Sequence, residues 1–180
     1  MSHVPHADTV AIVLAAGQGT RMNSVLAKVL HPMCGEPLLA HVLAALTETG
    51  IGRVLVVIGH QRERVREAFP QPGVEWVVQA EQRGTGHAIQ MAGPALAGFS
   101  GTLLVVCGDT PLLRGATLRA LLAHHAASGA AVTVLSTRVP DASGYGRIVR
   151  DARAERVAIV EERDATPGQK TIDEINSGIY

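Results

Sequence analysis

Short aliphatic runs alternate with segments of helical periodicity along most of this sequence, and that alternation limits the folds available to the chain. The aliphatic runs lie at 10–14, 54–58, 74–78, 103–106 and 132–136. The segments predicted to be helical lie between them, at 38–46, 62–69, 85–96 and 117–125. Parallel strands need a crossover connection, which is usually a helix. The alternation therefore predicts an α/β fold with a mostly parallel, mixed sheet and helices on both faces.

The last third of the chain has a different pattern. Runs at 144–149 and 157–160 predict shorter and more polar strands, separated by a charged turn at 150–156. A polar segment at 161–170 is expected to be a loop. The chain stops shortly after what resembles the start of another strand. We expect a flexible tail over 1–8 and one domain over 9–180 that is incomplete at its C-terminal end.

The composition argues against several classes of partner. Sixteen basic residues balance 16 acidic ones, and only 3% of the residues are aromatic. Neither nucleic acid nor a membrane surface is therefore expected as a partner. No apolar run approaches the length of about 20 residues that a membrane span needs, and 1–8 has no signal-peptide core. Cys34 and Cys107 lack metal-ligand spacing, which predicts reduced thiols in a cytoplasmic protein.

A glycine-containing turn directly follows the first aliphatic run. Residues 14–22 read Leu-Ala-Ala-Gly-Gln-Gly-Thr-Arg-Met, and Lys28 follows. Glycines let backbone N–H groups approach anionic oxygens, and the cations supply countercharge. A dinucleotide-binding turn would need a third glycine where Met22 stands. A P-loop would need Gly-Lys-Ser/Thr, which is absent from this turn. An ordinary turn and a different phosphate-binding loop remain as alternatives.

Together with Lys-Val-Leu at 28–30, this turn resembles the signature of the sugar-phosphate nucleotidylyltransferases. Within that group, further segments resemble the bacterial N-acetylglucosamine-1-phosphate uridylyltransferases, in order at 79–88, 108–112, 144–148, 159–161, 164–166 and 174–178. The resemblance implies a Rossmann-like nucleotidyltransferase (pyrophosphorylase) domain over 9–180. In that family, the rest of this domain and then a left-handed β-helix acetyltransferase domain follow. The resemblance also implies a homotrimeric full-length parent, with this chain alone expected to be a monomer.

The resemblance assigns roles to residues of this chain. Implied catalytic residues are Arg21, Lys28 and Asp109, with Asp109 also the ligand of Mg²⁺. Implied nucleotide-binding residues are Leu14, Ala15, Ala16, Gly17, Gly19, Thr20, Gln79, Gly84, Thr85 and Gly108. Implied sugar-binding residues are Gly146, Glu161 and Asn176. The family's second protein ligand of Mg²⁺, an asparagine, would lie beyond Tyr180.

Several of these residues also have simpler interpretations. Asp109 follows a predicted strand, where ligands of α/β sheets bind and where a hard carboxylate suits Mg²⁺, but it could also cap the helix near Thr117. Gln79 can present a donor and an acceptor to a pyrimidine edge, or it can be an ordinary surface glutamine. Thr85 could contact the base and also cap the helix that it begins. His87, in the same segment, is expected to be structural.

The resulting hypothesis is transfer of UMP from UTP to N-acetyl-α-D-glucosamine 1-phosphate, giving UDP-N-acetylglucosamine and pyrophosphate. The attacking phosphate oxygen is already anionic, so no general base is needed. Positioning and charge stabilisation would supply the catalysis. Two alternatives remain open: a fragment that binds nucleotide or sugar nucleotide without turnover, and a nucleotidylyltransferase for another sugar phosphate.

Overall fold

The protein is described here from a computed structural model that covers residues 8–180 except 20–21, 71–72 and 152–156. The chain divides into two compact units, one up to Gly129 and one from Ala130 onward. Each unit is described by itself. The expected tail over 1–8 lies almost wholly outside the described residues, and the single domain over 9–180 stays a prediction.

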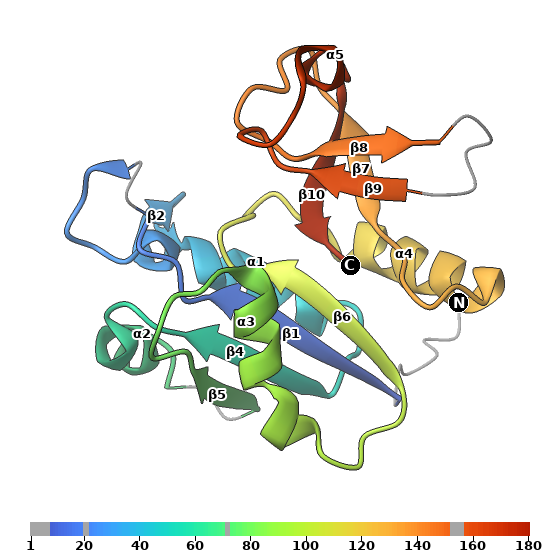
Figure 1. Cartoon of the computed structure of the whole chain (residues 1–180). Helices are drawn as coiled ribbons and strands as arrows, with labels where there is room; N and C mark the ends of the chain where they lie inside the picture. The colour runs from blue at the N-terminus through green and yellow to red at the C-terminus, as the bar shows by residue number, and fades with distance from the viewer. Residues whose placement is uncertain (1–7, 20–21, 71–72, 152–156) are drawn as a thin grey trace. The chain divides into compact units, whose positions relative to one another are not determined.

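The first unit is built on a parallel four-stranded sheet whose centre is the first aliphatic run (Figure 1). Strand β1 (Thr9–Ala15) pairs in parallel with β4 (Arg53–Ile58) on one side and with β6 (Thr102–Cys107) on the other. Strand β5 (Val74–Val78) pairs in parallel with β4, which gives the order β5-β4-β1-β6. Ile12 lies between Leu55 and Val105 and is fully buried. The predicted parallel sheet is confirmed.

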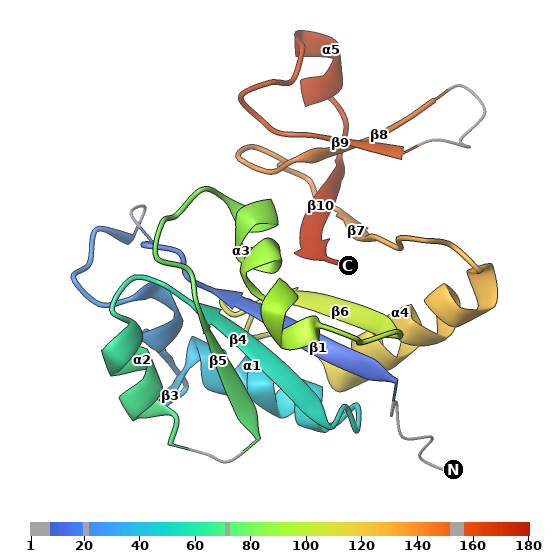
Figure 2. The ribbon, with the colours of Figure 1, turned by 60° about the horizontal axis from the view of Figure 1, so that its bottom comes forward.

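Helices cover both faces of this sheet. Helix α3 (Thr85–Met91) lies on one face, and α1 (Leu38–Thr47) and α4 (Gly115–Ser128) lie on the other (Figures 1 and 2). A further helix, α2 (Arg62–Ala68), connects β4 to β5. Right-handed crossovers explain this arrangement, because the chain runs outward from β1 to β5 and then returns across the sheet to β6. The order therefore reverses between β1 and β6, which is where doubly wound sheets bind their ligands.

Three of the predicted elements have different bounds in the structure. The helix expected over 85–96 ends at Met91, and a 3₁₀ turn, η3 (Gly93–Leu96), follows because Pro94 cannot donate the hydrogen bond that would continue an α-helix. The strand expected over 132–136 is β7 (Leu135–Arg138), and Val132 is exposed. The loop expected over 161–170 contains α5 (Pro167–Lys170), which begins at a capping box made by Thr166 and Gln169.

Sequence periodicity also missed the short elements between β1 and α1. These are the 3₁₀ turn η2 (Lys28–Leu30) and a hairpin of two-residue strands, β2 (Pro32–Met33) and β3 (Glu36–Pro37). Segments of two or three residues are too short to show a period. The turn η2 begins at Lys28, one of the predicted catalytic residues.

The second unit is an antiparallel sheet. It contains β7, β8 (Arg147–Arg150), β9 (Val157–Val160) and β10 (Glu174–Ile179), in the order β7-β10-β8-β9. Ile148 and Ile175 are buried in it. The shorter strands expected at 144–149 and 157–160 correspond to β8 and β9, which pair antiparallel in this separate sheet.

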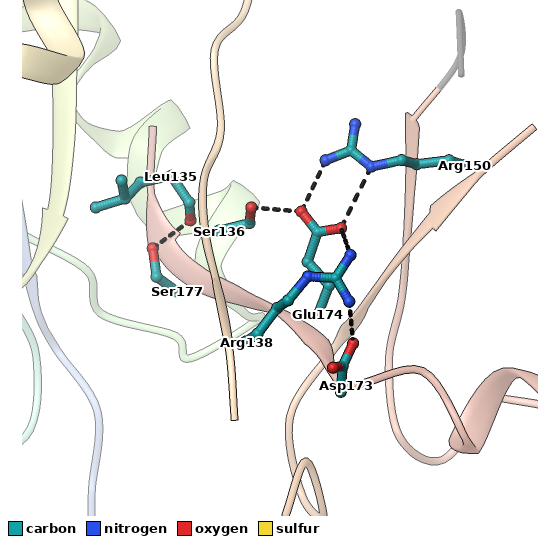
Figure 3. A network of polar contacts seen from close by, with 7 residues as sticks. All are labelled: Leu135, Ser136, Arg138, Arg150, Asp173, Glu174 and Ser177. Carbon is teal, nitrogen blue, oxygen red and sulfur yellow. Dashed lines mark hydrogen bonds and ion pairs between the residues drawn. The ribbon is translucent and has the colours of Figure 1, made fainter. Parts of the chain in front are cut away.

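Polar contacts on Glu174 hold three strands of this second sheet together (Figure 3). The carboxylate accepts hydrogen bonds from Arg150 of β8 at 2.7 Å and from Ser136 of β7 at 2.6 Å (Figure 3). Arg138 lies 3.9 Å from the other carboxylate oxygen. The hydrogen bonds from Arg150 and Ser136 lower the pKa of Glu174 below its ordinary value. These hydrogen bonds join β10 to both of its neighbours, β7 and β8.

None of the helices in the described part of the chain has the length and apolarity that a membrane crossing requires.

Candidate functional site

The carboxyl ends of the parallel strands surround a cavity of about 260 Å³ in the first unit. Its walls come from the end of β1 and the turn after it, from η2, from the segment after β5, from α3, and from the end of β6 and the residues after it. The lining residues are Leu14, Ala15, Ala16, Gly17, Lys28, Val29, Gln79, Gln82, Gly84, Thr85, Ala88, Cys107 and Asp109. Most of the predicted nucleotide-binding residues of this unit thus lie around one cavity.

Hydrogen bonds anchor the backbone at the start of the turn after β1. The carbonyl of Ala16 accepts a hydrogen bond from the Gln82 side chain at 2.8 Å. The Gly108 N–H donates to the carbonyl of Leu14 at 2.9 Å, which joins the end of β1 to the segment after β6. Thr20 and Arg21, which were predicted to bind and stabilise phosphates, lie outside the described residues. Their roles stay predictions.

The two glycines of this turn face different surroundings. A Cβ added at Gly17 would have no heavy atom within 4 Å among the described residues, although Gly17 lines the cavity. A Cβ added at Gly19 would lie 2.8 Å from the Cβ of Lys28, and Gly19 has φ +65°. Packing and backbone geometry thus explain Gly19, whereas Gly17 keeps cavity space open.

Alanine substitutions should separate these two roles. Gly17→Ala is expected to leave the melting temperature unchanged but to weaken UTP binding, because the added methyl group occupies the cavity. Gly19→Ala is expected to destabilise the fold by about 1 kcal/mol and to displace Lys28. Differential scanning calorimetry and isothermal titration with UTP measure both effects. Unchanged UTP affinity in Gly17→Ala would contradict this assignment.

Lys28 and Asp109 form an ion pair at the cavity, between the Nζ atom and Oδ2. Asp109 follows β6 directly after Gly108, and Lys28 begins η2, so chain segments far apart in sequence meet here. The helix α4 begins after Arg114 and has no side-chain cap. The alternative that Asp109 caps this helix is therefore wrong. The pair brings together two of the three predicted catalytic side chains.

Sequence analysis missed Gln61, which positions the segment before Lys28. Its Oε1 accepts a hydrogen bond from the Ala27 N–H at 3.0 Å, and its Nε2 donates to the carbonyl of Val25. Gln61 has φ +51°, a left-handed conformation uncommon outside glycine, at the start of α2. No sequence signal marks this role, because glutamine has no preference for such a position.

The segment after β5 supplies Gln79 to the cavity. The Gln79 side chain is only 3% exposed, which excludes the ordinary surface glutamine. Its Nε2 atom lies 3.2 Å from the carbonyl oxygen of Gly84 and 3.0 Å from Nδ1 of His87. Thr85 begins α3 after Gly84, and no side-chain cap is present at this helix start. The expectation that Thr85 caps the helix is wrong, because Gly84 occupies the cap position.

The three predicted sugar-binding residues all lie in the second unit. The Asn176 N–H donates to the carbonyl of Gly146 at 2.8 Å. A Cβ at Gly146 would lie 3.2 Å from Oε1 of Glu161, so this glycine allows the carboxylate to approach the backbone. The Asn176 amide donates to the hydroxyl of Tyr180 at 2.7 Å. The structure thus brings these three residues together with one another.

Cys107 lies at the end of β6 and lines the cavity. Burial raises the pKa of its thiol to about 11, with a further contribution from the negative charge of Asp109 and an opposing one from Lys28. Cys34 is an exposed thiol.

We expect iodoacetamide to alkylate Cys34 much faster than Cys107 at about pH 8, because the thiolate is the reactive form. The rate at Cys107 should increase with pH until about pH 11, as the thiol ionises. Peptide mass spectrometry of timed reactions measures both rates. Equal rates at the two cysteines would show that the Cys107 thiol is neither buried nor raised in pKa.

Over the described residues, no group of three or more His, Cys, Asp or Glu side chains is arranged to hold a metal ion. Asp109 is the acidic residue that lines the cavity.

Comparisons with known sequences identify the family to which the chain belongs. The MobA-like NTP transferase domain matches residues 11–170. The chain belongs to this family. Bifunctional protein GlmU of Pelobacter propionicus is 56% identical over 171 residues, and GlmU of Thermobifida fusca is 56% identical over 175 residues. The matches cover 94% of this chain but only 37% and 36% of those proteins. The chain thus spans little more than a third of the length of these relatives.

A solved structure supports the same fold. It is that of a Bacillus anthracis protein described as a glucose-1-phosphate thymidylyltransferase in complex with a sucrose. The match has a TM-score of 0.79 at 20% sequence identity, and it covers 95% of this chain and 70% of that one. The predicted Rossmann-like nucleotidyltransferase fold is confirmed.

Proposed function

We propose that this chain is the uridylyl-transferring part of an N-acetylglucosamine-1-phosphate uridylyltransferase. In this reaction UMP passes from UTP to N-acetyl-α-D-glucosamine 1-phosphate, and UDP-N-acetylglucosamine and pyrophosphate form. The observation that carries the proposal is the Lys28–Asp109 ion pair beside Gly17 in one cavity at the reversal point of the sheet. The similarity to the GlmU proteins supports the substrates.

The proposed mechanism uses fixed charges rather than proton transfer. The anionic phosphate of the sugar attacks the α-phosphate of UTP, the bond to the β-phosphate breaks, and pyrophosphate leaves with the electron pair. Lys28 stabilises the charge on the nonbridging oxygens, and Arg21 adds a second cation. Backbone N–H groups of the turn at Gly17, Gly19 and Thr20 orient the phosphates. Gln79, Gly84 and Thr85 bind the base, and Gly146, Glu161 and Asn176 bind the sugar.

The residues at the cavity fit Mg²⁺ delivered with the triphosphate. Magnesium keeps most of its ligands as water and phosphate oxygens and needs one or two carboxylates from the protein. Asp109, which lines the cavity, would hold the ion through its carboxylate. When bound, the ion neutralises charge on the triphosphate.

The ion pair is suited to exchange its partners on substrate binding. The side chains of Lys28 and Asp109 are 40% and 28% exposed. Ion pairs with this much solvent contact contribute about 1 kcal/mol or less to stability. Lys28 can therefore turn to phosphate, and Asp109 to the cation, with little loss of free energy.

We further propose a cytoplasmic location, in keeping with the exposed thiol of Cys34.

The test is UTP-dependent release of pyrophosphate by this chain, with UDP-N-acetylglucosamine identified by mass spectrometry. We expect release only when Mg²⁺ and N-acetylglucosamine 1-phosphate are both present. Equal release with glucose 1-phosphate would instead support a nucleotidylyltransferase for another sugar phosphate. Binding of UDP-N-acetylglucosamine without pyrophosphate release would instead support a fragment that binds sugar nucleotide without turnover.

A further inference from the structure

The Gln79 side chain is held by two hydrogen-bonding partners from one short segment of chain. Gln79 follows β5, and its own N–H donates to the carbonyl of Ile58 at 2.8 Å, which fixes its backbone against β4. Its Nε2 atom lies within hydrogen-bonding distance of the Gly84 carbonyl oxygen and of His87 Nδ1. Gly84 has φ +95°, a conformation that other residues rarely adopt, and His87 lies two residues into α3. Both partners of the Nε2 group therefore come from the segment at 84–87.

The carbonyl of Gly84 determines which way the Gln79 amide points. A carbonyl oxygen only accepts hydrogen bonds, so the amide must turn its Nε2 group toward it. Because an amide Nε2 group only donates, the ring nitrogen of His87 that faces it must carry a lone pair. With the amide turned this way, Nδ1 of His87 is the acceptor of its other N–H group, and this contact orients Gln79.

This arrangement uses both hydrogens of the Gln79 amide inside the protein. Within the described residues, Oε1 is the atom of this amide that remains available to a ligand of the cavity. Sequence analysis expected Gln79 to offer a base both a donor and an acceptor, but the structure leaves it as an acceptor alone. A base that pairs with Gln79 must therefore supply a donor.

We propose that His87 is a positioning residue that sets base selectivity by locking the Gln79 amide as an acceptor. Uracil and thymine carry a ring N–H between their two carbonyl groups and match that acceptor, whereas the corresponding nitrogen of cytosine is itself an acceptor. Two acceptors facing each other in a buried site leave both unpaired, which is the basis of strong discrimination. This inference rests on the proposed function, and it explains how the same cavity selects among pyrimidine nucleotides.

The test compares UTP and CTP affinity in three variants by isothermal titration calorimetry. His87→Phe keeps an aromatic ring but removes the acceptor, so the Gln79 amide can rotate. We expect its affinity for UTP to fall about three- to tenfold and its affinity for CTP to change less. The ratio of UTP affinity to CTP affinity should therefore decrease. His87→Asn places an amide oxygen near the position of Nδ1 and should restore most of the preference. His124→Phe makes the same change at an exposed position on α4 and is the matched control.

An unchanged ratio of UTP to CTP affinity in a folded His87→Phe variant would overturn the role of His87. Absence of uridine nucleotide binding by the unaltered chain would instead overturn the proposed function. A second measurement does not depend on any variant. Nitrogen-15 NMR of the unaltered chain should show the His87 tautomer protonated on Nε2, and a proton on Nδ1 would contradict the inference.

Discussion

Asp109→Asn is expected to lower pyrophosphate release by about 100- to 1,000-fold, the usual effect of removing one preorganised charge from a phosphoryl-transfer site. Asparagine keeps the size of the side chain but removes its charge, so the cation loses its ligand at the cavity. We also expect the dependence of UTP affinity on Mg²⁺ to weaken strongly, because Mg²⁺ then binds through the phosphates alone. Steady-state kinetics and titration at several Mg²⁺ concentrations measure both effects.

The fold should tolerate this change, since the Asp109 side chain is partly solvated and its ion pair contributes little to stability. Glu75→Gln is the matched control, because Glu75 also forms an ion pair, with Arg53, but does not line the cavity. We expect that variant to retain full activity. Normal turnover in Asp109→Asn would exclude Asp109 from the catalytic machinery.

Lys28→Ala is expected to reduce kcat/KM for UTP by about 100-fold or more, because a cation positioned at the phosphates is lost. Lys28→Arg should recover only part of the kcat/KM that Lys28→Ala loses, because a planar guanidinium does not replace a compact ammonium group. Kinetics at saturating and limiting UTP separate the effect on kcat from the effect on KM.

Arg62→Ala provides the control for Lys28→Ala. Arg62 is an exposed cation of α2 that is paired with Glu63 and does not line the cavity. Its removal changes the net charge equally and should leave kcat/KM unchanged. If both variants lost activity to the same extent, a general electrostatic effect would replace the specific role of Lys28.

Much of the first unit could be predicted from sequence because its signals are local. The runs that became β1, β4, β5 and β6 are continuous and aliphatic, as buried parallel strands require. The position of Asp109 at the end of a strand followed from the same pattern. The helix over 85–96 was overextended because the apolar spacing continues past Pro94, although proline cannot donate the next hydrogen bond.

The second unit was less predictable. Strand β7 begins three residues later than expected because its bounds are set by pairing with β10, as at Thr137 and Ile175. Pairing partners that come from distant parts of the chain leave no periodic signal in either segment. The hydrogen bonds that Ser136 and Arg150 donate to Glu174 leave no sequence signal either, because each of these residues taken alone resembles an ordinary surface polar residue.

By itself, the sequence determined the parallel α/β architecture and the kind of chemistry at the strand ends, because periodicity, glycines and charges are properties of short segments. Only the tertiary structure decided which of those side chains meet. The pairing of Lys28 with Asp109, the support of the loop before Lys28 by Gln61, and the orientation of Gln79 by His87 all depend on directional contacts. Hydrogen bonds and ion pairs need atoms within about 3 Å at defined angles, and that precision exists only once the strands are packed.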